Sequence, residues 1–373
     1  MAKVMEPFDY QPLETLATIR VIRIRPAAGL EVTGSIHCDI EHVQIGQVSY
    51  AALSYEWGPP NADDNDTTLP ENDTTIHLNG SLIAVRRNLH HALSHFRNSL
   101  GDQPIWIDAL SINQSDTLER SQQVSRMGSI YHGADQVMIW PGRTEGLDSN
   151  TLAALNRQSH EYGDRAKTTT EATLVIAKIE ELCQNGYWKR VWIQQEVFLA
   201  QKLGIMYGLD QLIPYETFDY LVSLMLSGES PVTDDVYNKI KESGAQTLLM
   251  RRRLSQHPTL NPLGTWLRIA CNNDLQTSEP RDLIYGMLGV SFDCHDGGLI
   301  PDYDKPLVDV YLETILFCRL KEPERKTEPF EKMVAEKLGL SWDEDMEHKI
   351  KEYCRRATGS EKATSTPHHQ IMS

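Results

Sequence analysis

The stretch PIWIDALSINQSDTLERSQQVSRMGSIYHGADQVMIW, residues 104–140, decides the fold. Its first six residues, 104–109, are apolar except for Asp108 and are typical of a buried strand, and residues 137–140 form a second apolar run after Gln136. Apolar residues between the two runs recur at helical spacing, and Asp116 with Glu119 three positions later predicts a capping box at the start of this helix. A strand, a helix and a strand in this order are typical of a parallel sheet with right-handed crossovers.

The sequence on the N-terminal side of this stretch extends the same pattern. Residues 50–57 (YAALSYEW) form another apolar run, and residues 85–100 carry the spacing of an amphipathic helix. Asn79-Gly80 between two short apolar runs predicts a β-hairpin. Alternation in Ile19–Arg25 and Ser35–Ile40 predicts two further strands, which we expect to form an N-terminal ribbon ahead of the main body.

These elements predict an α/β fold with a flavodoxin-like parallel sheet flanked by helices, followed by a mainly helical C-terminal region. We expect an N-terminal extension at residues 1–17 and the α/β domain at residues 18–210, with its core motifs between residues 50 and 198. The helical region is expected at residues 211–357. Residues 358–373 are expected to form a disordered tail, because this segment lacks apolar periodicity.

Composition excludes several classes of protein. The 373 residues carry 36 basic and 52 acidic side chains, a net charge of −16, which repels phosphate backbones and argues against nucleic-acid binding. The six cysteines are scattered without a CxxC pair, as is usual in a reducing compartment. Neither a signal peptide nor a stretch of about 18 apolar residues is evident, so we expect a cytoplasmic protein without a membrane span.

Tryptophans gather in one part of the chain. Five of the seven lie between residues 57 and 192, namely Trp57, Trp106, Trp140, Trp188 and Trp192. Three of them fall at or near the C-terminal ends of the expected parallel strands, which form the edge where open α/β sheets bind ligands. Trp57, Trp140 or Trp192 could stack on a flat base. The alternative is core packing, since an indole ring buries a large apolar area.

Three sequence blocks carry a family resemblance. They are YAALSYEWG at residues 50–58, WIDALSINQ at 106–114 and RVWIQQE at 190–196. In order and approximate spacing they resemble the signature blocks of the fungal heterokaryon incompatibility (HET) domain, over about residues 50–198. The resemblance implies a role in nonself recognition, in which activation triggers growth arrest or programmed cell death. Ser111 stands where that family usually has cysteine, so this loop offers no thiol nucleophile.

The third block suggests a reaction. A helix is expected at residues 187–199, in which Trp192 and Glu196 are four positions apart and so share one face. This spacing is similar to that of the catalytic helix of Toll/interleukin-1 receptor (TIR) domains, some of which hydrolyse NAD. The resemblance implies that Glu196 is the catalytic carboxylate and that NAD is a substrate, with no cofactor. The alternative is a helix carboxylate that pairs locally or caps a loop.

Three further polar residues are candidates for ligand binding. Ser54, at the end of the first expected parallel strand, could hydrogen-bond a ribose or a phosphate. Asp108 follows the second strand, where a polar residue can bind ligand but also commonly serves in a turn or a cap. Arg190 lies in the third block and could focus positive potential on an anion. His91 and His95 lack a third ligand nearby in the sequence, so we expect no metal site.

Two functions of different kinds stay open at this stage. One is a signalling enzyme that consumes NAD or a related nucleotide after self-association. The other is a non-enzymatic module that recruits a protein partner through the sheet edge and its tryptophans. Either function requires a protein partner or a second copy of the chain, and the first also requires a nucleotide ligand.

Overall fold

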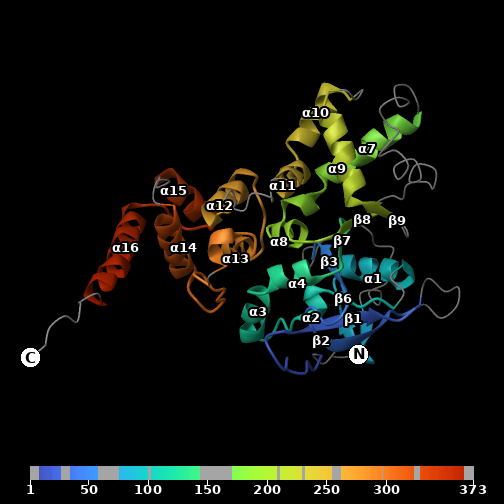
Figure 1. Ribbon diagram of the computed structural model, residues 1–373, viewed down its shortest axis with the longest axis horizontal. Coiled ribbons are helices and arrows are strands. Elements are labelled where there is room, and N and C mark those ends of the chain that lie inside the picture. Colours follow the sequence, from blue (N-terminus) through green and yellow to red (C-terminus); the bar gives the residue numbers. More distant parts are fainter. Residues whose placement is uncertain are drawn as a thin grey trace, which may run out of the picture. The chain divides into compact units, whose positions relative to one another are not determined.

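The computed structural model describes residues 8–26, 34–57, 75–99, 102–142, 170–207, 211–228, 232–253, 262–295, 297–322 and 328–364. The chain divides into two compact units, residues 1–256 and residues 257–373 (Figure 1). The sheet belongs to the first unit, and the described part of the second unit is helical. The acidic segment at residues 58–74 and the polar segment at residues 143–169 lie outside the described residues.

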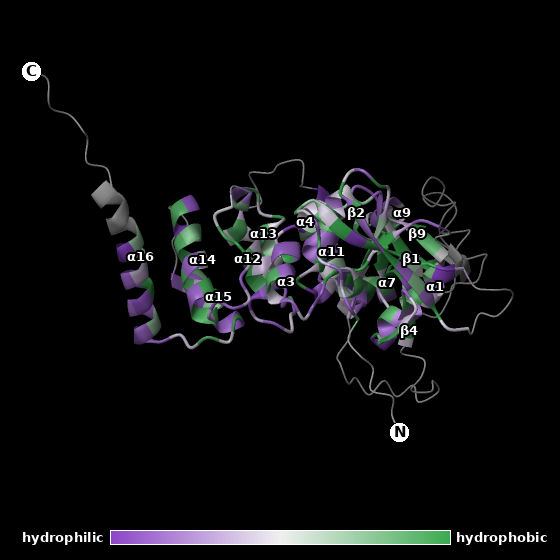
Figure 2. Ribbon diagram, turned by 90° about the horizontal axis from the view of Figure 1, so that it is seen from below, coloured by the Kyte–Doolittle hydropathy of each residue, from purple (hydrophilic) through white to green (hydrophobic). Residues whose placement is uncertain are grey.

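The strands of the first unit join in one mixed sheet. Their bounds are β1 (Thr18–Ile24), β2 (His37–Gln44), β3 (Ala51–Tyr55), β4 (Thr75–Leu78), β5 (Ser81–Ala84), β6 (Ile105–Trp106), β7 (Gln136–Trp140), β8 (Leu203–Tyr207) and β9 (Gln211–Pro214). Within the described residues their order across the sheet is β5-β4-β2-β1-β6-β3-β7-β8-β9. Most of the strand residues near the middle of this order are buried, and several strands are green, or hydrophobic, in Figure 2.

The centre of the sheet is parallel. Strand β3 pairs in parallel with β6 on one side and with β7 on the other, and β7 pairs in parallel with β8. The spatial order β6-β3-β7-β8 is therefore second, first, third and fourth along the chain, as in flavodoxin-like sheets. This confirms the predicted α/β class. The chain reverses its direction of winding between β3 and β7, and ligands of open α/β sheets bind at the carboxyl ends of such strands.

Antiparallel strands extend the sheet at both ends. Strand β1 pairs antiparallel with β2 and with β6, so the expected N-terminal ribbon is part of the main sheet. The predicted hairpin is present as β4 and β5, with φ of +48° at Asn79 and +82° at Gly80, the left-handed pair that a two-residue turn requires. Strand β9, which the sequence did not predict, pairs antiparallel with β8. The whole sheet is therefore mixed, with a parallel centre and antiparallel strands at both ends.

Helices cover both faces of the sheet (Figure 1). Leu53 and Tyr55 of β3 point into a core that includes Leu89 and Phe96 of α1 (Arg87–Ser99). The intervening Ser54 points to the opposite face, because successive side chains of a strand alternate. On that face lie α4 (Met127–Gly133) and α8 (Ile193–Phe198), which contact one another.

The structure revises three predicted element bounds. The strand expected at residues 104–109 ends at Trp106, because Asp108 begins the short helix α2 (Asp108–Ser111). The single helix expected after Asp116 is divided into α3 (Thr117–Val124) and α4. The helix expected at residues 187–199 is likewise divided into the 3-10 helix η2 (Gly186–Lys189) and α8.

The first unit continues beyond the sheet with further helices. They are α7 (Thr170–Gln184), α9 (Tyr215–Leu226), α10 (Asp234–Lys241) and α11 (Gly244–Arg253). Helix α9 contacts β8 and β9, and α11 contacts α7, α8 and η2. Because these helices pack against the sheet and against each other, the compact unit extends to Gln256. The sequence predicts that the α/β domain ends earlier, at residue 210.

The described part of the second unit consists of helices of different lengths. Their bounds are α12 (Leu263–Asn272), α13 (Asp282–Leu288), the 3-10 helix η5 (Phe292–Cys294), α14 (Leu307–Lys321), α15 (Glu328–Lys337) and α16 (Glu344–Thr364). Helix α12 contacts α13 and α15, and α14 contacts α16. Helix α16 continues past residue 358, where we expected the tail to begin, and residues 365–373 lie outside the described chain. No helix in the described part is long and apolar enough to cross a membrane.

Candidate functional site

Glu196 lies on α8 above the end of β3. Its backbone N–H donates to the carbonyl oxygen of Trp192 at 3.3 Å, so the two residues are one helical turn apart, as their spacing predicts. The Glu196 side chain is enclosed, with the residue only 2% exposed. Trp192 precedes the first turn of α8 and is half-buried.

Ser54 connects Glu196 to a second buried side chain. The Ser54 hydroxyl donates a hydrogen bond to Glu196 Oε2, and Ser54 Oγ is also hydrogen-bonded to the Tyr187 hydroxyl. A serine hydroxyl has one proton to donate, so Tyr187 must be the donor in the second bond when Glu196 is ionised. The structure thus brings two of the predicted candidates, Ser54 and Glu196, into direct contact, and it adds Tyr187, which sequence reasoning missed.

Burial decides how Glu196 titrates. Loss of hydration raises the pKa of Glu196 to about 7, and this effect outweighs the opposing influence of the Arg190 charge and of the Ser54 hydrogen bond. The charge of Asp108 raises the pKa of Glu196 further. A carboxyl group with this pKa exchanges its proton near neutral pH, which is the property that general acid–base catalysis requires.

Arg190 lies at the turn that precedes α8. One of its guanidinium nitrogens, Nη1, donates to the backbone carbonyl oxygen of Tyr55, at the carboxyl end of β3. Its positive charge lowers the pKa of both Glu196 and Asp108. Arg190 is therefore the cation that the two acidic candidates share, although neither of them forms a hydrogen bond with it in the described contacts.

Trp57 and Asp108 form a second pair of predicted candidates in contact. The indole Nε1 of Trp57 donates to Asp108 Oδ2 at 2.7 Å, and Asp108 Oδ1 accepts from the backbone N–H of Ala109 at 2.7 Å. Burial raises the pKa of Asp108, while the hydrogen bond from Trp57 lowers it. Asp108 thus holds the Trp57 ring in place at the start of α2.

Trp140 lies away from Glu196. It is paired in register with Tyr55 across β3 and β7, and both side chains belong to the core that α1 covers. Its Nε1 donates to Asn88 Oδ1 at 2.8 Å, and the Asn88 amide donates to the Glu56 carbonyl oxygen at 2.6 Å. With 4% of its surface exposed, Trp140 packs the α1 face, opposite the face that carries Ser54.

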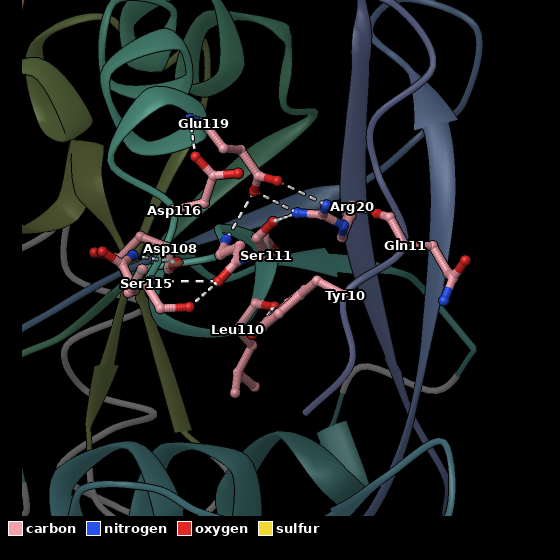
Figure 3. Close-up of polar contacts among 11 residues, drawn as sticks. Tyr10, Gln11, Arg20, Asp108, Leu110, Ser111, Ser115, Asp116 and Glu119 are labelled. Carbon is pink, nitrogen blue, oxygen red and sulfur yellow. Dashed lines mark hydrogen bonds and ion pairs between the residues drawn. The ribbon is translucent and has the colours of Figure 1, made fainter. Parts of the chain in front are cut away.

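A buried ion pair, absent from the sequence predictions, supports the loop after α2 (Figure 3). Arg20 of β1 donates to both carboxylate oxygens of Glu119, at 2.6 and 2.9 Å, and to the carbonyl oxygen of Ser111 at 3.0 Å. Glu119 also accepts from the backbone N–H of Asn113 at 2.7 Å. One sequence feature could have predicted this ion pair. Arg20 lies in the expected strand at residues 19–25, on the same strand face as the apolar Ile22.

The predicted capping box is present only in half. Asp116 Oδ1 accepts from the backbone N–H of Glu119 at 3.0 Å, which caps α3 as expected. The Glu119 carboxylate turns to Arg20 and the Asn113 backbone instead of returning to Asp116. Among the described residues no three His, Cys, Asp or Glu side chains gather as a metal site would need.

Comparison with known proteins places these residues in a family context. Residues 50–196 match the family model described as Heterokaryon incompatibility protein (HET), a range that runs from the start of β3 to Glu196. The chain is also 26% identical over 352 residues to Heterokaryon incompatibility protein 6, OR allele, of Neurospora crassa. That match covers 79% of this chain and 51% of the relative, so the chain spans about half the length of the curated protein it matches. No solved structure matches the chain.

Proposed function

We propose that residues 50–196, which match the HET family model, form a HET domain, that the protein acts in fungal nonself recognition and that its activation stops growth or kills the cell. The name of the Neurospora relative supports a role in heterokaryon incompatibility. We further propose that the protein acts in the cytoplasm and that a protein partner or a second copy of the chain activates it.

We propose NAD hydrolysis as the chemistry of the Glu196 site. In this reaction the bond between ribose C1′ and the nicotinamide nitrogen breaks, and its electron pair leaves with neutral nicotinamide. Water adds its oxygen to C1′, which gives ADP-ribose and releases one proton. The ionised Glu196 would stabilise the positive charge that develops at C1′ and accept the proton from the attacking water.

The observation that carries this proposal is the burial of Glu196, which raises its pKa, together with its hydrogen bond from Ser54. A carboxyl group whose pKa burial has raised to about 7 is ionised in about half of the molecules at neutral pH, and it can both accept and return a proton. Ser54 donates to it from the carboxyl end of β3, at the point where the parallel strand order reverses. Perturbed carboxyl groups at this location are typical of functional sites in α/β folds.

A second candidate function is favoured by the same burial. Because Glu196 is 2% exposed and covered by Ser54 and Tyr187, a substrate can reach it only after neighbouring side chains move. A carboxyl group enclosed in this way also suits a purely structural role. The HET domain would then be a non-enzymatic module that recruits a partner through the sheet edge.

Measuring NAD and growth in the same cultures separates the two functions. Fungal cells are induced to express the full chain, its Glu196→Gln variant or a Glu181→Gln control at matched protein levels. Glu181 is a suitable control because it is exposed and pairs with Lys178 on α7. We expect wild type and Glu181→Gln to lower NAD and stop growth, and Glu196→Gln to do neither.

Other outcomes have definite meanings. Growth arrest at constant NAD would contradict hydrolysis and favour the recruiting module. Growth arrest by Glu196→Gln equal to that of wild type would exclude Glu196 as the catalytic carboxylate. If neither NAD nor growth changes with wild type, the chain is not a self-sufficient effector.

A further inference from the structure

A cavity of about 410 Å³ opens on the α1 side of the first unit, and none of the roles described above uses it. Its wall includes Tyr55 at the end of β3, Trp57 just beyond it and Leu89 of α1. Ala109 of α2 and Arg86, which precedes α1, complete this part of the lining. Its volume lies in the range of cavities that hold small molecules, about 300–1,000 Å³.

The Trp57 ring is fixed before any ligand arrives. Its Nε1 is hydrogen-bonded to Asp108 Oδ2 at 2.7 Å. The guanidinium carbon of Arg86 lies 5.3 Å from the centre of the same ring, within the distance of a cation–π interaction. Asp108 thus holds the Trp57 ring at its edge, and Arg86 places a positive charge over one of its faces. The fixed ring forms a flat part of the cavity wall.

The N-terminal segment supplies another part of the wall. Phe8 and Tyr10 both line the cavity, and their rings pack edge to face with centroids 4.9 Å apart. The Tyr10 hydroxyl donates to the carbonyl oxygen of Leu110 at 3.1 Å, as Figure 3 shows. Arg20 holds the same segment by donating to the Gln11 carbonyl oxygen at 2.7 Å. The buried ion pair of Arg20 therefore also keeps this wall of the cavity in place.

The lining selects the kind of ligand. Aromatic rings and aliphatic side chains make up most of the described lining, in which Gln114 is polar and Arg86 is charged. No carboxylate belongs to this lining, although the Asp108 carboxylate that holds Trp57 also interacts electrostatically with Arg86. A sugar or a polyphosphate would leave polar groups unpaired against such walls, at a cost in binding free energy. We infer that this cavity binds a flat, largely apolar small molecule with one acidic group, whose charge meets Arg86.

This ligand site is separate from Glu196. Ser54 and Tyr55 are adjacent in β3 and so face opposite sides of the sheet. Ser54 contacts Glu196, whereas Tyr55 lines the cavity, and the lining includes neither Ser54 nor Glu196. The inference therefore goes beyond the proposed hydrolysis and does not depend on it.

Titration calorimetry with the full chain tests the inference. Naphthalene-2-carboxylate is the probe, naphthalene-2-carboxamide is its neutral counterpart, and AMP represents a nucleotide. We expect the carboxylate to bind about tenfold more tightly than the amide, the effect of one charge-assisted contact, and AMP to bind more weakly than the carboxylate. Failure of the carboxylate to bind at millimolar concentration, or tighter binding of AMP, would overturn it.

Two arginine variants locate the contact. Arg86→Gln should weaken the carboxylate about tenfold and leave the amide unchanged, because only the carboxylate uses the charge. Arg87→Gln is the matched control, since it removes an equal charge from the next position, at the start of α1 and outside the lining. Equal effects of the two variants would show that the probe responds to overall charge and would contradict the inference.

Further variants separate this site from the others. Ala109→Leu fills part of the cavity and should weaken both naphthalene probes, with circular dichroism as the check that the variant is folded. If that variant does not fold, the comparison of Arg86→Gln with Arg87→Gln still decides. Glu196→Gln should bind the carboxylate like wild type, so a negative result at Glu196 in the NAD experiment leaves this inference unaffected.

Discussion

Glu119 and Glu196 are both enclosed within the first unit, but Glu119 faces a guanidinium group and Glu196 faces hydroxyl groups. Glu119 shares two hydrogen bonds with Arg20, whose side chain is 1% exposed. Glu196 accepts from Ser54, and Arg190, whose charge lowers the pKa of Glu196, donates to the Tyr55 carbonyl oxygen. One carboxylate is therefore neutralised directly and the other is not.

This difference distinguishes a structural acid from an acid that can react. A buried charge with an ionic partner in direct contact holds two segments together and loses that role when either partner is removed. A buried carboxyl group that meets only hydroxyl groups keeps part of its desolvation penalty, and its pKa rises. The pKa of Glu196 rises to about 7 for this reason.

The largest effect is expected from breaking the Glu119 pair. Glu119→Gln leaves the Arg20 guanidinium buried without a countercharge, which should lower the free energy of unfolding by about 3–5 kcal/mol. Urea denaturation of the full chain measures the change. Glu41→Gln is the matched control. Glu41 pairs with Arg23, which lies on β1 like Arg20, but the side chains of this pair are both about 40% exposed.

The control should change stability by less than about 1 kcal/mol, since an exposed pair is weak. Equal losses for Glu119→Gln and Glu41→Gln would contradict a structural role for the buried pair. The double variant Arg20→Met with Glu119→Leu should lose less than the two single variants together, because no unpaired charge remains.

A smaller effect is expected from the pH dependence of Glu196. Its pKa in the folded chain is about 7, above its ordinary value of 4.5, so between these pH values the folded state binds more protons than the unfolded state. The free energy of unfolding should therefore fall as pH rises through this window and level off above it. Between pH 5 and pH 8 the loss in wild type should exceed that in Glu196→Gln by about 2 kcal/mol.

Urea denaturation at several pH values measures both curves. Glu181→Gln is again the control and should follow wild type, since Glu181 lies exposed on α7. Parallel curves for wild type and Glu196→Gln would mean that Glu196 does not titrate in this range. In that case Glu196, like Glu119, would be a structural carboxyl group that does not exchange its proton near neutral pH.

The smallest effect is expected at Ser54. Ser54→Ala removes the donor to Glu196 and the acceptor for Tyr187, which should lower the free energy of unfolding at pH 5 by about 1 kcal/mol. It should also move the pH dependence upward, because the Ser54 hydrogen bond lowers the pKa of Glu196. Ser49→Ala, which removes a hydroxyl that donates to Asp135 at the surface, should do neither. An unchanged pH profile in Ser54→Ala would show that the hydroxyl does not stabilise the ionised carboxylate.

Much of the fold could be read from local pattern. The strand at residues 136–140 and the Asn79-Gly80 turn appear where alternation and turn chemistry predict them. The short helix α2 was missed, because one turn of helix after a two-residue strand has no periodicity of its own. Strand β9 was missed for a similar reason, since four residues carry too little pattern.

The sequence predicted several residues of the candidate site, but it did not predict which of them contact one another. Ser54 and Glu196 were each singled out by position in a motif, yet they are 142 positions apart in the chain. Tyr187 and Arg86 carry no local signal that separates them from ordinary packing or surface residues. Trp57 and Trp140, two of the tryptophans proposed to stack on a base, both pack on the α1 side of the sheet, opposite the face that carries Ser54, and local pattern could not indicate this.

The sequence by itself determined the α/β class, the order of its central elements and the motifs that match the HET family, because each of these depends on residues close together in the chain. Only the tertiary structure decided that Arg20 neutralises Glu119, that Glu196 meets Ser54 and titrates near pH 7, and that Trp57 and Arg86 border a cavity. The physical reason is that pKa values and cavity linings depend on burial and on partners that are far apart in sequence. Those quantities exist only once the sheet and its helices have packed.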